Sequence, residues 1–134
     1  MINKNKLSTI INIDKHPIKD STYRSECRGK LDNDGVLVLE DFLLKGTIKS
    51  ILKEAYEQED LAYFCVNKHN VYLEPSDSSF QKSHPRNKTV ISSKGCITDN
   101  QVPSKSSLRS LYNSKIFKEF LCEVLNEEAL YKYD

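Results

Sequence analysis

The chain has 134 residues, of which 38% are hydrophobic and 29% charged, with few glycines and prolines. This composition excludes a collagen-like or a wholly disordered protein, and the length fits one domain with a buried core. Twenty basic residues against nineteen acidic ones give a net charge of +1. No overall field therefore draws the protein to nucleic acid or to an anionic membrane, and we expect neither as a partner.

The start of the chain and its cysteines bear on where the protein works. The first residues lack the apolar stretch of a secretory signal, and no run is long enough to span a membrane. The cysteines lie far apart without a Cys-x-x-Cys pair, so the sequence does not indicate a zinc site. We expect a cytoplasmic protein in which four reduced thiols pack as small hydrophobic groups, namely Cys27, Cys65, Cys96 and Cys122.

Residues 1–17 end at His16-Pro17. Because proline disfavours a helical residue before it, we expect them to form an extended lead-in. Residues 18–31 carry an apolar side chain at every fourth position, which predicts an amphipathic helix. The three side chains that mark its inner face are Tyr23, Cys27 and Leu31.

The stretch from Lys30 to Leu43 contains the most strand-like run. A polar turn ending in Gly35 precedes four consecutive apolar residues, 36–39. A short unbroken apolar run bounded by turn residues is typical of a strand buried on both faces. We expect this run to be the central strand of the core, with amphipathic helices packed on either side.

Residues 47–59 predict the clearest helix, with Thr47 as its N-cap. Its apolar side chains recur at spacings of three and four, which predicts a buried face made of Ile48, Ile51, Leu52, Ala55 and Tyr56. Two short apolar runs follow, at 61–66 and 71–73. They form either a hairpin or two separate strands near a ligand mouth.

Residues 74–88 are a long polar tract, which in a compact domain is either a functional lid or a mobile segment. Short strands are expected at 89–91 and 95–97. The apolar spacing then predicts helices at 106–112 and 114–125, the second capped by Asn113 or Ser114. Together these elements predict an α+β fold.

No complete catalytic constellation is present, and none of the three histidines has an acidic residue two positions later. His84 and Arg86 lie in the long polar tract, where they would meet an anionic substrate or simply face solvent. Arg109 would hold a carboxylate through its two-pronged guanidinium, or pair with a neighbouring acidic residue at the surface. His69 fits an exposed turn better than a pocket rim.

Four stretches carry a resemblance to a known family: Asp32 to Leu43, Ile97 to Pro103, Ser107 to Tyr112 and Ile116 to Leu121. The first, Asp-Asn-Asp-Gly-Val-Leu-Val-Leu-Glu-Asp-Phe-Leu, resembles the opening strand of non-haem Fe(II)/2-oxoglutarate-dependent dioxygenases. The others are similar to a branch whose substrates are often amino acids or related small molecules. The resemblance covers about residues 18–134.

The resemblance implies that residues 18–134 are the N-terminal helix and strand layer of a double-stranded β-helix (jelly-roll) oxygenase, after the lead-in 1–17. The family's iron triad and its basic 2-oxoglutarate ligand would follow beyond Tyr133-Asp134, so the barrel is incomplete here. We expect this chain to bind neither Fe(II) nor 2-oxoglutarate and to be inactive by itself. It would be a truncated reading frame or one part of a split protein.

In the full enzyme a missing C-terminal barrel would be its partner, and His84, Arg86 and Arg109 would be lid residues that contact a small-molecule substrate. Whether the chain is an enzyme stays open at this point. The alternative is a small intracellular binding or interaction protein without catalysis, which would use an exposed apolar face.

Overall fold

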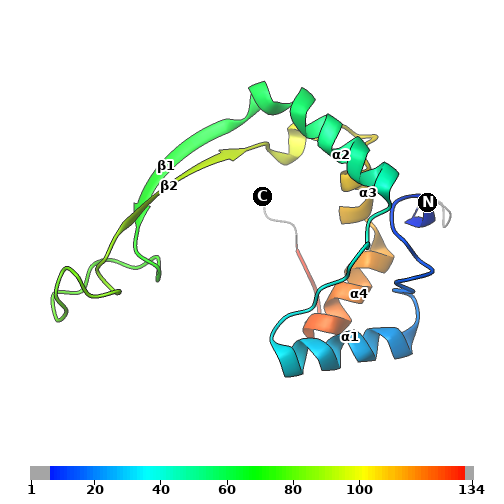
Figure 1. Cartoon of the computed structure of the whole chain (residues 1–134), viewed down its shortest axis with the longest axis horizontal. Coiled ribbons are helices and arrows are strands. Elements are labelled where there is room, and N and C mark those ends of the chain that lie inside the picture. Colours follow the sequence, from blue (N-terminus) through cyan, green and yellow to red (C-terminus); the bar gives the residue numbers. More distant parts are fainter. Residues whose placement is uncertain (1–6, 132–134) are drawn as a thin grey trace. The chain divides into compact units, whose positions relative to one another are not determined.

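A computed structural model describes residues 7–131, which form an α+β protein with four α-helices and one two-stranded antiparallel sheet (Figure 1). They divide into a helical unit, residues 7–57 and 102–131, and a ribbon unit, residues 58–101. Residues 1–6 of the expected lead-in, and residues 132–134, lie outside the described residues.

Helix α1, Ser21–Asp34, confirms the first expected helix. It begins where the Asp20 carboxylate accepts a hydrogen bond of 2.8 Å from the Tyr23 backbone N–H, as an N-cap residue does. It ends at Gly35, whose φ of 68° is favoured by glycine and whose N–H donates to the Leu31 carbonyl. The polar turn expected before residue 36 is therefore the last turn of this helix.

The prediction of a central strand at residues 36–39 is wrong. Within residues 7–131 the segment pairs with no strand, and Val36 and Val38 are 56% and 64% exposed. Leu37 and Leu39 are half-buried against the core, so only alternate side chains contribute to it. An apolar run shows that a segment is hydrophobic. A central strand also needs a strand hydrogen-bonded on each side, and no such neighbours flank this run among residues 7–131.

The segment between α1 and α2 joins the N-terminal part of the chain just beyond that run. Ile11 and Leu43 form an isolated antiparallel bridge. The Asn12 N–H donates to the Phe42 carbonyl at 2.8 Å, and the Leu44 N–H donates to the Ile10 carbonyl at 3.0 Å. These bonds hold the described part of the lead-in, which starts with the 3-10 helix η1, Leu7–Thr9, against the helical unit.

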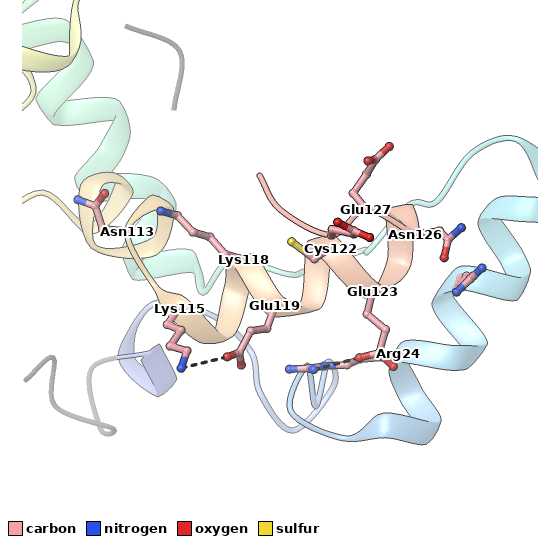
Figure 2. A pocket seen from close by; sticks show the side chains of 11 residues that line it. Arg24, Asn113, Lys115, Lys118, Glu119, Cys122, Glu123, Asn126 and Glu127 are labelled. Atoms are coloured by element: carbon pink, nitrogen blue, oxygen red, sulfur yellow. Dashed lines mark hydrogen bonds and ion pairs between the residues drawn. The ribbon is translucent and has the colours of Figure 1, made fainter. Parts of the chain in front are cut away.

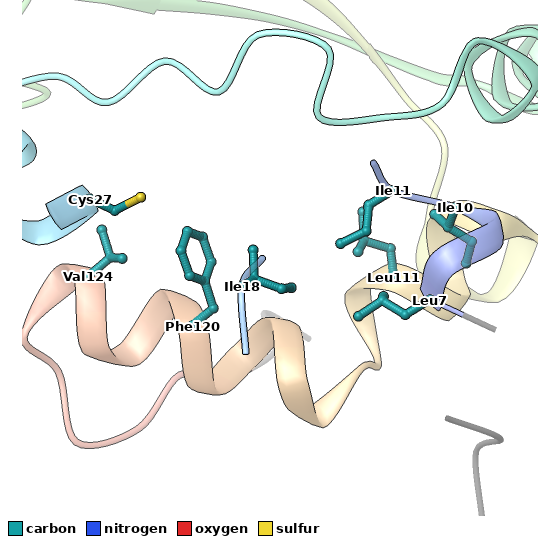
Figure 3. Packing of buried hydrophobic residues seen from close by; sticks show 8 residues of the cluster. All are labelled: Leu7, Ile10, Ile11, Ile18, Cys27, Leu111, Phe120 and Val124. Carbon is teal, nitrogen blue, oxygen red and sulfur yellow. The ribbon is translucent and has the colours of Figure 1, made fainter. Parts of the chain in front are cut away.

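The core of the helical unit therefore combines the N-terminal segment with three helices (Figure 3). Burial of such side chains from water is the main force that holds the unit together. The buried apolar residues are Leu7, Ile10, Ile11, Ile18, Cys27, Leu111, Phe120 and Val124.

Helix α2, Lys45–Glu57, confirms the expected helix but starts two residues earlier. Thr47 is not its cap, because it lies inside the first turn, is buried, and donates a hydrogen bond from its hydroxyl to the Thr9 carbonyl at 3.3 Å. The expected buried face was also wrong. Ile51 is half-buried, but the other larger side chains are exposed, with fractions of 42% for Ile48, 50% for Leu52 and 73% for Tyr56.

Helices α3, Ser107–Tyr112, and α4, Lys115–Leu125, confirm the last two predicted helices. The Ser106 hydroxyl caps α3 and also donates to the Glu54 carboxylate at 2.8 Å, which ties α3 to α2. Ser114 caps α4, one of the two caps considered, and α4 packs along α1.

The ribbon unit is built on β1, Tyr63–His69, and β2, Val90–Cys96, which pair in antiparallel register. The two short strands expected at 89–91 and 95–97 are parts of this single β2. Residues 71–73 form no strand, so the partner of β1 comes instead from the far side of a long connection.

Candidate functional site

The connection between β1 and β2, residues 70–89, carries two of the candidate residues, His84 and Arg86. It has no regular secondary structure, so its backbone groups must find partners in side chains, turns or water. Two asparagines supply many of these partners.

Asn70 is buried where the chain leaves β1. Its side-chain N–H groups donate to the carbonyls of Glu74 and Arg86, both at 2.7 Å. Its side-chain oxygen accepts from the backbone N–H groups of Tyr72, at 3.0 Å, and Glu74, at 3.2 Å. An amide has two donors and an oxygen with two acceptor positions, so Asn70 is fully used in joining the two ends of the connection.

Asn87 does the same for the other half of the connection. Its side-chain nitrogen lies 2.7 Å from the Asp77 carbonyl and 2.8 Å from the Phe80 carbonyl, and its oxygen accepts from the Asp77 N–H at 2.7 Å. The polar tract is thus held by side-chain to backbone bonds in place of a hydrophobic core. This arrangement fixes the backbone on which His84 and Arg86 are carried.

His84 is exposed, and its ring stacks on Phe80 with centroids 4.4 Å apart. Its Nδ1 atom accepts from the Arg86 backbone N–H at 3.2 Å, so in the neutral ring the proton is on Nε2, which is left to meet a ligand. Stacking holds the ring without burying it.

Arg86 is half-buried between two partners. Its guanidinium carbon lies 5.7 Å from the centre of the Tyr72 ring, a cation–π distance, and its Nε lies 3.4 Å from the Asp77 carboxylate. Hydrogen bonds from Ser79, followed by the charge of Arg86, hold the pKa of Asp77 below its usual value. An incoming anion would therefore compete with Asp77 for Arg86.

His69, expected as an exposed turn histidine, is the last residue of β1 and is half-buried. Its Nδ1–H donates to the Asn70 carbonyl at 2.9 Å, and its Nε2 accepts from the Ser92 hydroxyl at 3.1 Å in the neutral ring. Both ring nitrogens thus serve the ribbon itself.

Arg109 belongs to the helical unit, on α3. Its guanidinium donates twice to the Val102 carbonyl, from Nε at 3.2 Å and from Nη2 at 2.7 Å. Two of its five donors therefore hold the chain that leads into α3. The structure brings His84 and Arg86 together in one connection and gives Arg109 a different local setting.

A hollow lies within the helical unit, along α4 and beside α1, with a volume of about 710 Å³ (Figure 2). Two ion pairs cross its surface, Arg24 to Glu123 at 3.1 Å and Lys115 to Glu119 at 3.6 Å. We call it the α4 groove. Its lining residues are Arg24, Arg28, Asn113, Lys115, Lys118, Glu119, Cys122, Glu123, Asn126, Glu127 and Glu128.

The cysteines differ in setting more than the sequence predicts. Cys27 is buried in the core, whereas Cys65 and Cys122 are half-buried and Cys96 is exposed, and all four are free thiols. Within residues 7–131, no three side chains of His, Cys, Asp or Glu gather closely enough to hold a metal ion. Among the helices formed by the same residues, none is both long and apolar enough to cross a membrane.

The protein thus has an α+β architecture with a helical unit and a ribbon unit, and in the ribbon unit two asparagines hold the connection between the strands. No family model matches the chain, and no curated protein or solved structure matches it.

The roles of Asn70 and Asn87, and the α4 groove, were not predicted from the sequence. The two asparagines stand near the ends of the connection 70–89, close to the strands, and that position is the signal that would have identified them as loop-closing residues. The groove had no such signal, because it joins residues of α1 and α4 that are far apart in the sequence, such as Arg24 and Glu123, which are 99 positions apart.

Proposed function

We propose that the chain forms the N-terminal layer of an Fe(II)/2-oxoglutarate-dependent oxygenase that acts on a small, amino-acid-like molecule, and that it is not catalytic by itself. The family is suggested by the sequence resemblance described above. The observation that carries the proposal is the uncovered β1–β2 ribbon.

Both faces of this ribbon present large apolar side chains to solvent. Phe64, Val66 and Ile91 lie on one face, with exposed fractions of 67%, 68% and 73%, and Tyr63 is exposed on the other. A two-stranded ribbon is marginally stable in water, and three or more strands with a buried face are normally needed. Exposed apolar faces on strands with open edges favour a larger sheet, as a barrel provides.

The connection 70–89 suits the part of a lid in such an enzyme. Asn70 and Asn87 fix its backbone, and His84 and Arg86 supply a hydrogen-bond donor and a positive charge for an anionic substrate group. In the family, iron and 2-oxoglutarate activate oxygen for hydroxylation. The described residues offer no donor set that fits the iron, so we assign no oxygen chemistry to them.

Two experiments test the proposal. Sequencing the DNA that follows the Asp134 codon should reveal an in-frame strand with a His-x-Asp or His-x-Glu pair. A stop codon at that point, together with a cooperatively folding monomer, would contradict it. Titration of the purified chain with Fe(II) and 2-oxoglutarate should give no stoichiometric binding and no 2-oxoglutarate turnover, and turnover by this chain alone would overturn the claim that it is inactive.

A second candidate function is a binding protein without catalysis. The pairs of Phe80 with His84 and Tyr72 with Arg86 favour it, because ordered aromatic and arginine side chains at a surface are typical of binding hot spots. The ribbon faces would then be covered by a partner protein. A closed reading frame and a stable, folded chain would support this candidate over the first.

A further inference from the structure

The α4 groove has an ordered distribution of charge along the helix (Figure 2). Lys115 and Lys118 stand in the first turn of α4, whereas Glu127 and Glu128 follow its last residue. Of these four, only Lys115 has an ion-pair partner within residues 7–131, the exposed Glu119 one turn away. The α4 side of the groove is therefore basic at one end and acidic at the other. From α1 the groove also receives Arg24, which pairs with Glu123, and Arg28, which pairs with Asp32.

This order of charges along α4 is opposite to the order that stabilises a helix by itself. A helix has partial positive charge at its N-terminus and partial negative charge at its C-terminus, so acidic residues stabilise the first turn and basic residues the last. The first turn of α4 contains no acidic residue and its last turn no basic one. Stability of the isolated helix does not account for the pattern, whereas an oppositely directed neighbour would compensate both ends.

Cys122 lies near the middle of the α4 face that lines the groove. It points away from the buried side of α4, which carries Phe120 and Val124, and its thiol is half-buried in the groove. Lys118 and Asn126 stand four residues before and after it, about 6 Å along the axis in each direction at 1.5 Å per residue. A two-fold axis beside Cys122 would therefore place the basic end of one helix against the acidic end of another.

We propose that the α4 groove is a docking surface for a second copy of this chain. The two α4 helices lie antiparallel, Lys118 of each copy faces Glu127 and Glu128 of the other, and the two Cys122 thiols are neighbours. A two-fold interface needs a surface that is complementary to itself, and this distribution of charge is self-complementary.

The expected complex is weak and depends on salt. One pair of helices buries less area than a standard stable interface, and exposed ion pairs are individually weak and screened by ions. The dimer is independent of the proposed oxygenase function, because it uses the helical unit and no residue of the connection 70–89.

Charge reversal provides the main test, with sedimentation equilibrium of the purified chain at low salt as the measurement. Lys118→Glu alone, or Glu127→Lys with Glu128→Lys, should weaken association about tenfold. An equimolar mixture of the two variants should associate again, because each charge then meets its opposite across the interface. Lys49→Glu makes the same change of charge on α2, outside the groove, and should leave association unchanged.

The Cys122 thiols provide an independent test. Diamide takes two electrons and two protons from a pair of thiols, and it should link two chains through Cys122, as located by peptide mass spectrometry under non-reducing conditions. Cys122→Ser should remove that link, whereas Cys96→Ser, an exposed position outside the α4 groove, should leave it in place. Because the substituted side chains are exposed or half-buried, circular dichroism should show an unchanged helix content.

Three results would overturn the proposal. The chain could remain monomeric at millimolar concentration, Lys118→Glu could behave like Lys49→Glu, or diamide could link chains only through the exposed Cys96. Failure of the mixed variants to associate while the unmodified chain dimerises would also reject the antiparallel arrangement.

Discussion

The Nδ1 atom of His16 lies 2.7 Å from the hydroxyl oxygen of Tyr23, inside the helical unit. The other ring nitrogen, Nε2, donates to the Glu40 carbonyl at 2.7 Å, so in the neutral ring Nδ1 accepts from the tyrosine hydroxyl. His16 is buried, and its ring also lies 5.6 Å from that of Phe42. One histidine therefore joins α1 to the residue that directly follows the run 36–39, which was expected to be the central strand.

Replacement of His16 with alanine should lower the free energy of unfolding by about 2–4 kcal/mol, because it leaves the part-buried Tyr23 hydroxyl and Glu40 carbonyl without their partner and creates a cavity where the buried ring was. Urea denaturation followed by circular dichroism measures the change. His84→Ala removes an exposed histidine whose contacts, the Phe80 ring and the Arg86 N–H, lie at the surface, so it should cost clearly less. Equal losses for the two variants would contradict the role given to His16.

Tyr23 should make the helical unit sensitive to alkali. Burial is the main cause that raises the pKa of Tyr23 above its usual value, and a hydrogen bond with the Cys27 thiol adds to it. The folded state then holds the proton more tightly than the unfolded state, whose tyrosine titrates near pH 10, so this stability is present below about pH 10 and is lost as the pH rises further. Urea midpoints between pH 8 and 11 should fall more steeply for the unmodified chain than for Tyr23→Phe.

Asn70 and Asn87 should control the order of the connection 70–89. Replacement of either with alanine removes at least three hydrogen bonds to the backbone, and we expect faster amide exchange and faster proteolysis there, with α1 and α4 unchanged. Asn67→Ala is the matched control, because the Asn67 side-chain nitrogen has one long contact, 3.8 Å from the Cys65 sulfur. Exchange rates that match in all three variants would show that other contacts order the connection.

Phe120 and Phe64 allow a buried phenylalanine of the helical unit to be compared with an exposed one of the ribbon unit. Phe120→Ala should destabilise the helical unit by about 3–5 kcal/mol, since this buried ring packs among Ile18 and Val124 of the core cluster. Phe64→Ala should have a much smaller effect, because the ring is largely exposed above Gly95 on the ribbon. Thermal unfolding of both variants tests the difference, and a comparable loss for Phe64→Ala would mean that the ribbon face is covered in solution.

Local chemistry in the sequence determined the helices of this protein. Apolar spacing located α1, α2, α3 and α4, and Ser114 was recognisable as a cap, because helix periodicity and capping depend on residues within one or two turns of each other. The α+β class followed from the same local signals.

Only the tertiary structure decided which apolar segments are inside. Residues 36–39 have the stronger strand pattern, yet Ile10 and Ile11 of the N-terminal segment are the more deeply buried, and α2 leaves most of its apolar stripe exposed. The pairing of β1 with β2 and the link from His16 to Glu40 likewise join residues more than twenty positions apart. Burial and pairing depend on which distant segment supplies the facing surface. The apolar pattern of one segment does not identify the segment that packs against it.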